Sequence, residues 1–359
     1  MKKILHGLRP FKSAFRNQIE GLRMITYRVE SREKYALIAI PQLLVRIDIS
    51  GELQVEPDLW VNTTFPFNLA DHWKEWIGSI ATSELEMAQL FLLTKGPSAE
   101  PETLDGDNRK YQLRIYKFYQ GLMLSGFLRC DGQPLLLTGA SQKGNIDVRE
   151  YRGLPNPHYI PGSPIDNIDI GRLNLVAKLA SAIDIIPRKG KYDRFNHVFS
   201  IFFAGIESEA ADESLHHFVR CIEGFIFPEP GKTRKRFLSR TELFIGPGHH
   251  QLLGELFDIR SSVEHLHSSI RDINGSTDRE KWLTLFERAY EAGAIARYCI
   301  RTFLLNPGLW KHFEDDNALN LFWSLPDKDR RKLWGDPLDI QAITKQFDPS
   351  GIRDDELAS

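Results

Sequence analysis

The chain has 359 residues, and its 46 Lys plus Arg against 48 Asp plus Glu give a formal net charge of -2. Hydrophobic residues make up 42% and charged residues 26%, which is ordinary for globular domains and excludes a wholly disordered chain. The near-neutral balance also excludes a chain-wide basic surface for nucleic acid, so any such binding would need a local patch.

Cysteine usage and apolar run lengths indicate the cellular compartment. Cys130, Cys221 and Cys299 are too few and too far apart for a disulfide framework or a cysteine-rich zinc site. The basic N-terminus has no apolar stretch behind it, unlike a secretory signal. The densest apolar run, at 197–206, is about half as long as a membrane-spanning helix. We therefore expect a cytoplasmic protein with no membrane partner.

Residues 1–160 have the pattern of an α+β domain. Short β-branched or aromatic stretches, with a turn at Ser50-Gly51-Glu52, predict the following strands: 24–31, 34–40 and 43–55. Apolar spacings of three and four predict a helix over 69–95. The segment 153–171 is rich in Pro and Gly and is predicted to be the boundary of this domain.

From residue 170 onward the pattern is helical. Amphipathic segments with short connections follow one another at 171–184, 192–209, 214–227, 231–245, 249–270 and 279–305. Asn306-Pro307-Gly308 ends the last of them. Short connections favour an antiparallel arrangement, so we expect an all-α bundle over 170–305 and a helical C-terminal tail over 306–359.

Common catalytic motifs are missing from the sequence. Gly231-Lys232-Thr233 ends like a phosphate-binding loop, but the glycine that such a loop needs at position 226 is Ile226. The His216-His217 and His249-His250 pairs leave a metal-dependent hydrolase as one hypothesis, although no carboxylate lies at a ligand spacing beside them. We expect neither a metal nor a cofactor.

One polar constellation lies late in the helical region. Arg260 is followed by two serines, Val263 and Glu264, and then by His265 and His267. The apolar face expected for this helix is Leu252, Leu256, Ile259, Val263 and Leu266. On an ideal helix His267 lies about 20° and His265 about 140° from Arg260. The residues alone are also compatible with a solvated arginine that pairs with Asp258 or Glu264.

The stretch LFDIRSSVEHLHS at 256–268 resembles the Arg-x4-6-His motif of HEPN domains, in particular the ApeA-like branch. The residues that match this pattern in order are Phe257, Arg260, Ser261, Val263 and His265. The likeness covers roughly 170–305. It implies that the fold is an α+β N-terminal domain, for sensing, regulation or substrate binding, followed by an all-α HEPN helical bundle.

The resemblance implies a metal-independent endoribonuclease that acts as a homodimer, with Arg260 and His265 of each copy facing those of the other. In such enzymes the RNA 2′-OH attacks the adjacent phosphodiester and leaves a 2′,3′-cyclic phosphate. The residue types suit this reaction, because histidine transfers protons near neutral pH and arginine stabilises charge on phosphorus. Proteins of this kind serve in antiphage defence or toxin systems.

Three alternatives stay open. Family spacing favours His265 as the catalytic imidazole, whereas ideal helical geometry favours His267. The basic residues Lys232, Arg234, Lys235, Arg236 and Arg240 are either an RNA-backbone contact or a solvated helix face. Ser261 stands where many HEPN enzymes have Asn, Asp or His, which leaves a non-catalytic HEPN scaffold or RNA-binding module as the second reading.

Overall fold

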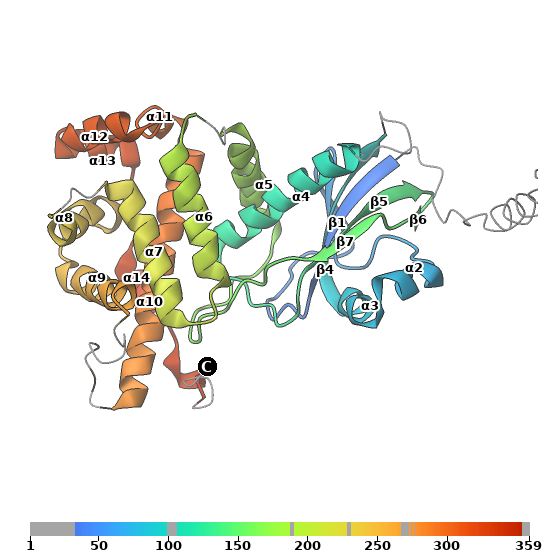
Figure 1. Cartoon of the computed structure of the whole chain (residues 1–359), viewed down its shortest axis with the longest axis horizontal. Helices are drawn as coiled ribbons and strands as arrows, with labels where there is room; N and C mark the ends of the chain where they lie inside the picture. The colour runs from blue at the N-terminus through green and yellow to red at the C-terminus, as the bar shows by residue number, and fades with distance from the viewer. Residues whose placement is uncertain are drawn as a thin grey trace, which may run out of the picture.

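A computed structural model describes the parts of the chain at 33–98, 106–186, 190–227, 231–266, 273, 275 and 277–353. An antiparallel sheet with flanking helices forms the N-terminal region, and helices form the region from residue 170 onward (Figure 1). The predicted order of a mixed α and β region followed by a helical region is therefore confirmed.

The strands of the described residues form one antiparallel sheet. Their bounds are β1 Glu33–Pro41, β2 Glu52–Glu56, β3 Leu59–Asn62, β4 Ala88–Pro97, β5 Leu135–Gln142, β6 Asn145–Ile146 and β7 Glu150–Gly153. The order is β2-β3-β4-β1-β5-β6, and β7 also pairs with β5. Strand β1 lies at the centre, with Glu33 opposite Pro97 of β4 and opposite Ser141 of β5.

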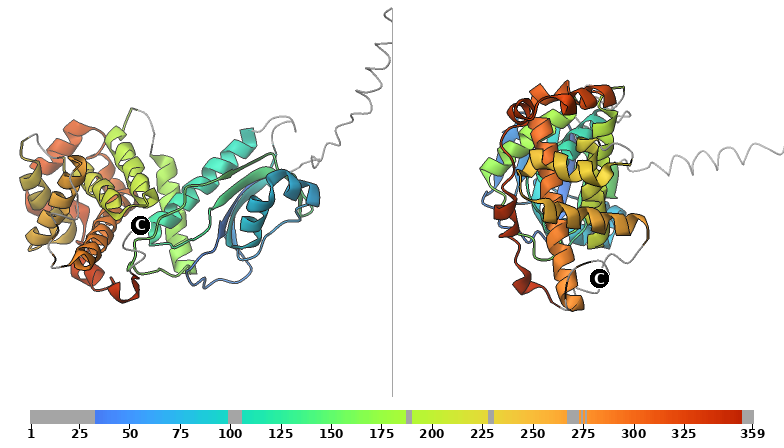
Figure 2. Two further views of the ribbon diagram at one scale, coloured as in Figure 1. Left: turned by 60° about the horizontal axis from the view of Figure 1, so that its bottom comes forward. Right: turned by 90° about the vertical axis from the view of Figure 1, so that its left-hand side faces the viewer.

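Both faces of β1 are buried, because its side chains alternate between two hydrophobic clusters. Ala36, Ile38 and Ile40 pack on the side of helix α4 (Gly106–Ser125). The other side chains, Tyr35, Leu37 and Ala39, face α2 (Asp71–Ile77) and α3 (Ser79–Glu86). Figure 2 shows α4 on one face of the sheet and α2 with α3 on the other.

The predicted helix over 69–95 is wrong in its second half. Gly78, at φ +88°, separates α2 from α3 and adopts a backbone conformation that other residues rarely take. Residues 88–97 then form β4, which pairs with β1. A short apolar run fits a buried strand as well as a buried helix, and here the pairing with β1 decides.

The hairpin prediction is only partly correct. Residues 34–40 lie within β1, but of 43–55 only the end belongs to β2. The chain turns at Pro57 and Asp58, between β2 and β3, and not at Ser50-Gly51-Glu52. The predicted strand at 24–31 lies outside the described residues.

The segment between β7 and α5 (Ile170–Ile185) contains no helix or strand, as its Pro and Gly content predicts. It does not separate two cores, because a single hydrophobic cluster joins α4 to the helices that follow. Gly121 of α4 allows this junction: a Cβ there would lie 2.9 Å from the Val176 carbonyl oxygen of α5. The two regions therefore share one core.

The helices match the six segments predicted for the bundle. Besides α5 they are α6 Asp193–Glu207, α7 Ala211–Ile226, α8 Thr233–Ile245, α9 His250–Glu264 and α10 Asp278–Leu305. The apolar residues that recur at helical spacing along α7 are all buried: Leu215, Phe218, Val219, Ile222, Phe225 and Ile226. The tail carries α11 Pro307–Trp310, α12 Asp316–Ser324, α13 Asp327–Trp334, α14 Ile340–Thr344 and the short 3-10 helix Pro349–Gly351.

Aromatic packing fixes α7 at the centre of the helical region. The Phe225 ring has its centroid 6.3 Å from that of Phe195 on α6 and 6.4 Å from that of Phe303 on α10. The tail closes the same cluster, with Trp334 at 6.0 Å. Rings at these separations contribute about 0.5–1.5 kcal/mol per pair beyond their burial. Within the described residues no helix is long and apolar enough to cross a membrane.

Candidate functional site

Helix α9 positions the motif arginine. Its buried residues include Leu253, Leu256 and Ile259, which pack toward α7 and α8. The predicted apolar face is therefore wrong at its end, because Leu266 is 94% exposed. The helix ends at Glu264, so Leu266 lies beyond it and does not belong to its buried face.

The chain leaves the helix at His265. This residue is the C-cap, is exposed, and donates its backbone N–H to the Ser261 carbonyl at 3.1 Å. Leu266 follows in the left-handed region at φ +57°. The ideal-helix angles used for the two histidines therefore do not apply past Glu264. His267 lies outside the described residues.

Arg260 lies between two carboxylates. Its guanidinium is 3.0 Å from Glu223 Oε2 on α7 and 2.8 Å from Glu264 Oε2 one turn along its own helix. The guanidinium carbon also lies 5.9 Å from the centroid of the Phe257 ring. The Arg260 side chain is only 16% exposed, so these contacts hold it in one position.

Glu223 is the buried member of this group. Burial raises the pKa of its carboxyl, and the Arg260 charge opposes that rise. Glu223 Oε1 and Arg260 Nε are buried and have no hydrogen-bond partner among the described residues. A buried carboxylate that pairs with one arginine restricts the arginine strongly, because separating them leaves a charge unpaired. Glu223 therefore positions Arg260, while Glu264, with its side chain 41% exposed, faces solvent.

The paired histidines lie at two separate places. His216 Nδ1 is 3.4 Å from the Arg260 carbonyl oxygen, and its ring lies 5.5 Å from that of His217. Burial and the neighbouring His216 lower the pKa of His217. His250, at the opposite end of α9, pairs instead with Glu242 at 3.2 Å. In the described part of the chain no three His, Cys, Asp or Glu side chains gather as a metal site would require.

The basic segment is not gathered at Arg260. Arg234 of α8 binds both oxygens of Asp258, at 3.1 and 3.0 Å. Asp258 and Arg260 are two residues apart and so lie about 200° apart around α9. Lys232 and Lys235 are exposed, whereas Arg236 is half-buried.

Arg240 has a structural role. It donates to the carbonyl oxygens of Ile226 and Phe227, both at 2.7 Å, where α7 ends. Its guanidinium also lies 4.9 Å from the centroid of the Trp323 ring. A cation that caps the last carbonyls of a helix stabilises the helix end. We therefore leave Arg240 out of the proposed RNA contact.

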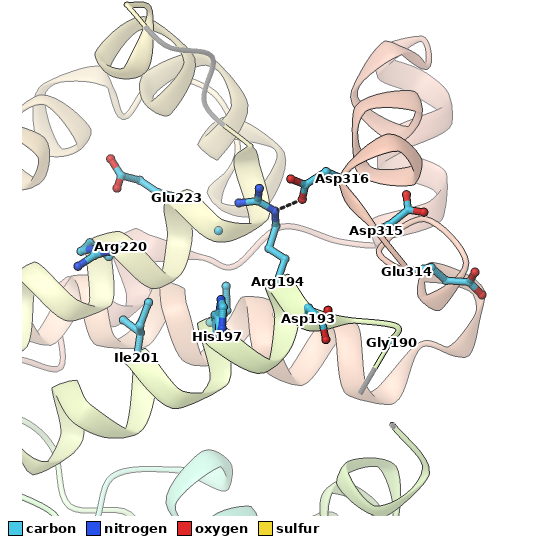
Figure 3. Close-up of a pocket in the computed structure, with 12 residues that line it drawn as sticks. Gly190, Asp193, Arg194, His197, Ile201, Arg220, Glu223, Glu314, Asp315 and Asp316 are labelled. Atoms are coloured by element: carbon cyan, nitrogen blue, oxygen red, sulfur yellow. Dashed lines mark hydrogen bonds and ion pairs between the residues drawn. The ribbon is translucent and has the colours of Figure 1, made fainter. Parts of the chain in front are cut away.

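A cavity of about 600 Å³ adjoins the Arg260 site through Glu223 (Figure 3). Arg194 and His197 of α6 and Arg220 of α7 supply its basic side chains. Its acidic side chains are more numerous: Asp193, Glu223, Glu314, Asp315 and Asp316. Figure 3 shows Arg194 paired with Asp316, and the Arg194 Nε donates to Asp316 Oδ1 at 2.6 Å.

The sequence left Asp258 or Glu264 open as a partner of a solvated Arg260; the structure shows Glu264 as one partner, and the sequence analysis missed Glu223. A signal for Glu223 was present, because it lies four residues after Val219 and one after Ile222, at the border of the apolar face of α7. A carboxylate at such a border is buried only with a partner. The identity of that partner could not be read from the sequence, since Arg260 is 37 positions away.

The site therefore consists of an arginine fixed by a buried carboxylate, an exposed histidine five residues later at the C-cap of the same helix, and a second imidazole on α7. A comparison of the chain with models of known protein families, with curated proteins and with solved structures finds no match.

Proposed function

We propose that this protein is a metal-independent endoribonuclease of the HEPN type, with Arg260 and His265 as its catalytic residues. One observation carries the proposal: the buried Glu223 holds Arg260 in the last turns of α9, five residues before the exposed His265 that caps the helix. A fixed guanidinium and an exposed histidine at one end of a helix are suited to binding a phosphodiester and to moving protons around it.

In the proposed reaction the ribose 2′-oxygen forms a bond to phosphorus as the bond from phosphorus to the 5′-oxygen breaks. One imidazole accepts the 2′-OH proton and another delivers a proton to the leaving 5′-oxygen. The Arg260 guanidinium donates to the phosphoryl oxygens, where negative charge grows. Glu264 would have to release Arg260 to the phosphate, which its exposure permits.

The HEPN resemblance favours a homodimer, in which each copy supplies Arg260 and His265, because His216, the second imidazole of one copy, has its Nδ1 against the Arg260 carbonyl oxygen. RNA would lie across the exposed ends of the two α9 helices. We do not place it in the adjoining cavity, because the acidic residues of that lining would repel phosphates. Lys232 and Lys235 are exposed cations that could contact the RNA backbone outside the site. The biological setting proposed is antiphage defence or a toxin system in the cytoplasm.

The test is RNA cleavage by purified full-length protein in EDTA, with the ends of the products analysed. We expect 2′,3′-cyclic phosphate and 5′-OH ends, no cleavage of DNA, and a loss of about 10²-fold or more in Arg260→Ala and in His265→Ala. His250→Ala, at the other end of α9, is the matched control and should retain full activity.

Separate outcomes decide the details. Activity that survives His265→Ala but not His267→Ala would assign the proton transfer to His267. Restored cleavage in a mixture of Arg260→Ala and His265→Ala subunits would indicate a site shared between two copies. Full activity in Arg260→Ala, or cleavage abolished by EDTA, would refute the proposed mechanism.

A second function is favoured by the two carboxylates on Arg260. Their charges compensate the guanidinium before any RNA arrives, as expected of a non-catalytic HEPN scaffold or RNA-binding module. This alternative predicts RNA or partner binding without cyclic-phosphate products. Binding that is equal in wild type and in His265→Ala, with no cleavage by either, would support it.

A further inference from the structure

A second cavity, of about 560 Å³, lies where the two regions of the molecule meet. Its walls come from the end of α4, the segment around Asp166, the long helix α10 and the C-terminal segment around α14. Figure 1 shows α4 running from the sheet toward the helical region and α14 beside α10. The cavity is separate from the Arg260 site and shares no lining residue with the cavity of Figure 3.

Two arginines of α10 line this cavity. Arg297 and Arg301 are four residues apart and so lie on one face of the helix. Arg297 is only 7% exposed, and its Nε donates to the Met123 carbonyl at 3.3 Å. Arg301 is half-buried, with one long contact of 3.5 Å to the Ser125 carbonyl. Among the described residues neither arginine forms an ion pair with a carboxylate.

The charge around the cavity is not balanced. Arg172 adds a third buried guanidinium beside it, and Asp166 is the one carboxylate among the lining residues. Asp166 Oδ2 accepts a hydrogen bond from the Phe127 backbone N–H at 2.7 Å. Asp169 also acts on Arg172, so three guanidinium charges face two carboxylates, and one positive charge has no carboxylate. The Arg297 guanidinium lies 3.9 Å from the centroid of the Phe127 ring, which compensates its charge in part. Burial lowers the pKa of Arg297 to about 9; Asp166 opposes this shift, while Arg301 and Arg172 add to it.

An uncompensated buried cation is unfavourable unless something pairs with it. A phosphate monoester carries close to two negative charges, and guanidinium forks match its oxygens in geometry as well as in charge. The rest of the lining suits an organic group: Ala294, Leu305, Leu338 and Ile343 are apolar, and Phe127 and Tyr290 are aromatic. The volume falls within the range of roughly 300–1,000 Å³ that small-molecule sites have.

We propose that this cavity binds a small organic phosphate, of the size and shape of a nucleoside monophosphate, with its phosphate between Arg297 and Arg301. The apolar and aromatic walls would hold the flat base. Because the cavity is formed by both regions and by the C-terminal segment, a bound ligand would tie all three together. The proposal is independent of the nuclease assignment, since ligand binding and RNA cleavage are separate measurements.

The test uses the full-length protein with AMP, adenosine and inorganic phosphate, measured by equilibrium dialysis and by the melting temperature. We expect one AMP per chain, a rise in melting temperature with AMP, and at least tenfold weaker binding of adenosine, which lacks the anion. Arg301→Gln should weaken AMP binding at least tenfold. The AMP affinity of Arg301→Lys should lie between those of wild type and Arg301→Gln. Arg331→Gln, on α13 and outside the lining of this cavity, is the matched control and should bind as wild type does.

The ligand-free variants add an independent readout. Removal of one of two unpaired neighbouring charges should leave the melting temperature of Arg301→Gln equal to or above that of wild type, whereas a purely structural arginine would lower it. AMP that binds no better than adenosine, or equally well in Arg301→Gln, would mean an adventitious anion contact elsewhere and would overturn the proposal. If the protein binds inorganic phosphate but does not bind AMP, the proposal of a nucleotide-sized ligand is overturned.

Discussion

The arginines at two places in the molecule differ in how their positive charge is compensated. At the end of α9, Arg260 is 16% exposed and has two carboxylates within 3.0 Å. At the junction of the two regions, Arg297 is 7% exposed and its one hydrogen bond within the described residues is to a backbone carbonyl. Solvent would compensate the first far more readily than the second. The more buried cation is thus the one without a carboxylate, although its guanidinium lies 3.9 Å from the centroid of the Phe127 ring, and this difference is the basis of the proposed phosphate site.

A third arginine shows what a structural role requires. Arg172 donates to Ser125 Oγ at 2.7 Å and to the carbonyl oxygens of four residues, namely Leu122, Phe127, Asp166 and Asn167. All its nitrogens are therefore used, as expected when an arginine joins loop to helix. Arg297 and Arg301 lie beside it and have no such set of acceptors. The contrast between these three residues can be tested by substitution.

The largest effect is expected from Arg172→Leu. The change leaves several buried acceptors without a donor, so we expect the free energy of unfolding to fall by about 3–5 kcal/mol. Urea denaturation of the full-length protein measures it. Arg301→Gln should show no loss, because it removes one of two neighbouring cations that have no carboxylate partner. Equal losses in the two variants would make both arginines structural and remove the contrast.

A smaller loss is expected from Glu223→Ala. It leaves Arg260 with the exposed Glu264 alone, so the free energy of unfolding should fall by about 1–3 kcal/mol. RNA cleavage should fall as well, because the guanidinium is no longer held in place. A double-mutant cycle with Arg260→Ala isolates the coupling of the pair. Additive losses in that cycle would show that Glu223 does not position Arg260.

Glu264→Ala should have little effect on stability. An exposed pair one helical turn apart contributes about 0.3–0.5 kcal/mol, so the midpoint of urea denaturation should barely move. RNA binding should be retained or strengthened, since the phosphate no longer competes with a carboxylate for Arg260. Filter binding at fixed salt measures this. Weaker RNA binding in Glu264→Ala would mean that phosphate does not replace this carboxylate.

The smallest effect concerns pH. The pKa of His217 is lowered in the fold, so its contribution to stability is present above the unfolded-state pKa and is lost as pH falls through the folded value. The raised pKa of Glu223 acts in the opposite sense, because its protonation on acidification favours the fold. The measurement is the free energy of unfolding between about pH 7.5 and 5.5, a window that lies above the pKa of an ordinary glutamate. As pH falls through this window, the free energy of unfolding should decline less in His217→Gln than in wild type. Equal slopes in both would exclude His217 as the titrating group.

Much of the helical region could be predicted because its signal is local. The apolar positions of α7 recur at helical spacing, and all six of them are buried. The end of α10 before Asn306-Pro307-Gly308 was also correct. The strand β4 could not be predicted, because its apolar run fits a helix equally well until β1 is available as a partner.

The candidate site, too, could be predicted from the sequence only in part. The sequence by itself determined that Arg260 and His265 lie at one end of a helix, because their spacing is set by five positions of chain. The partner Glu223, the second imidazole at His216 and the cavity between Arg297 and Arg301 were decided only by the tertiary structure. The physical reason is that charges compensate one another through space, between helices that are far apart in the chain. Helical periodicity, by contrast, depends only on residues that are close together in the sequence.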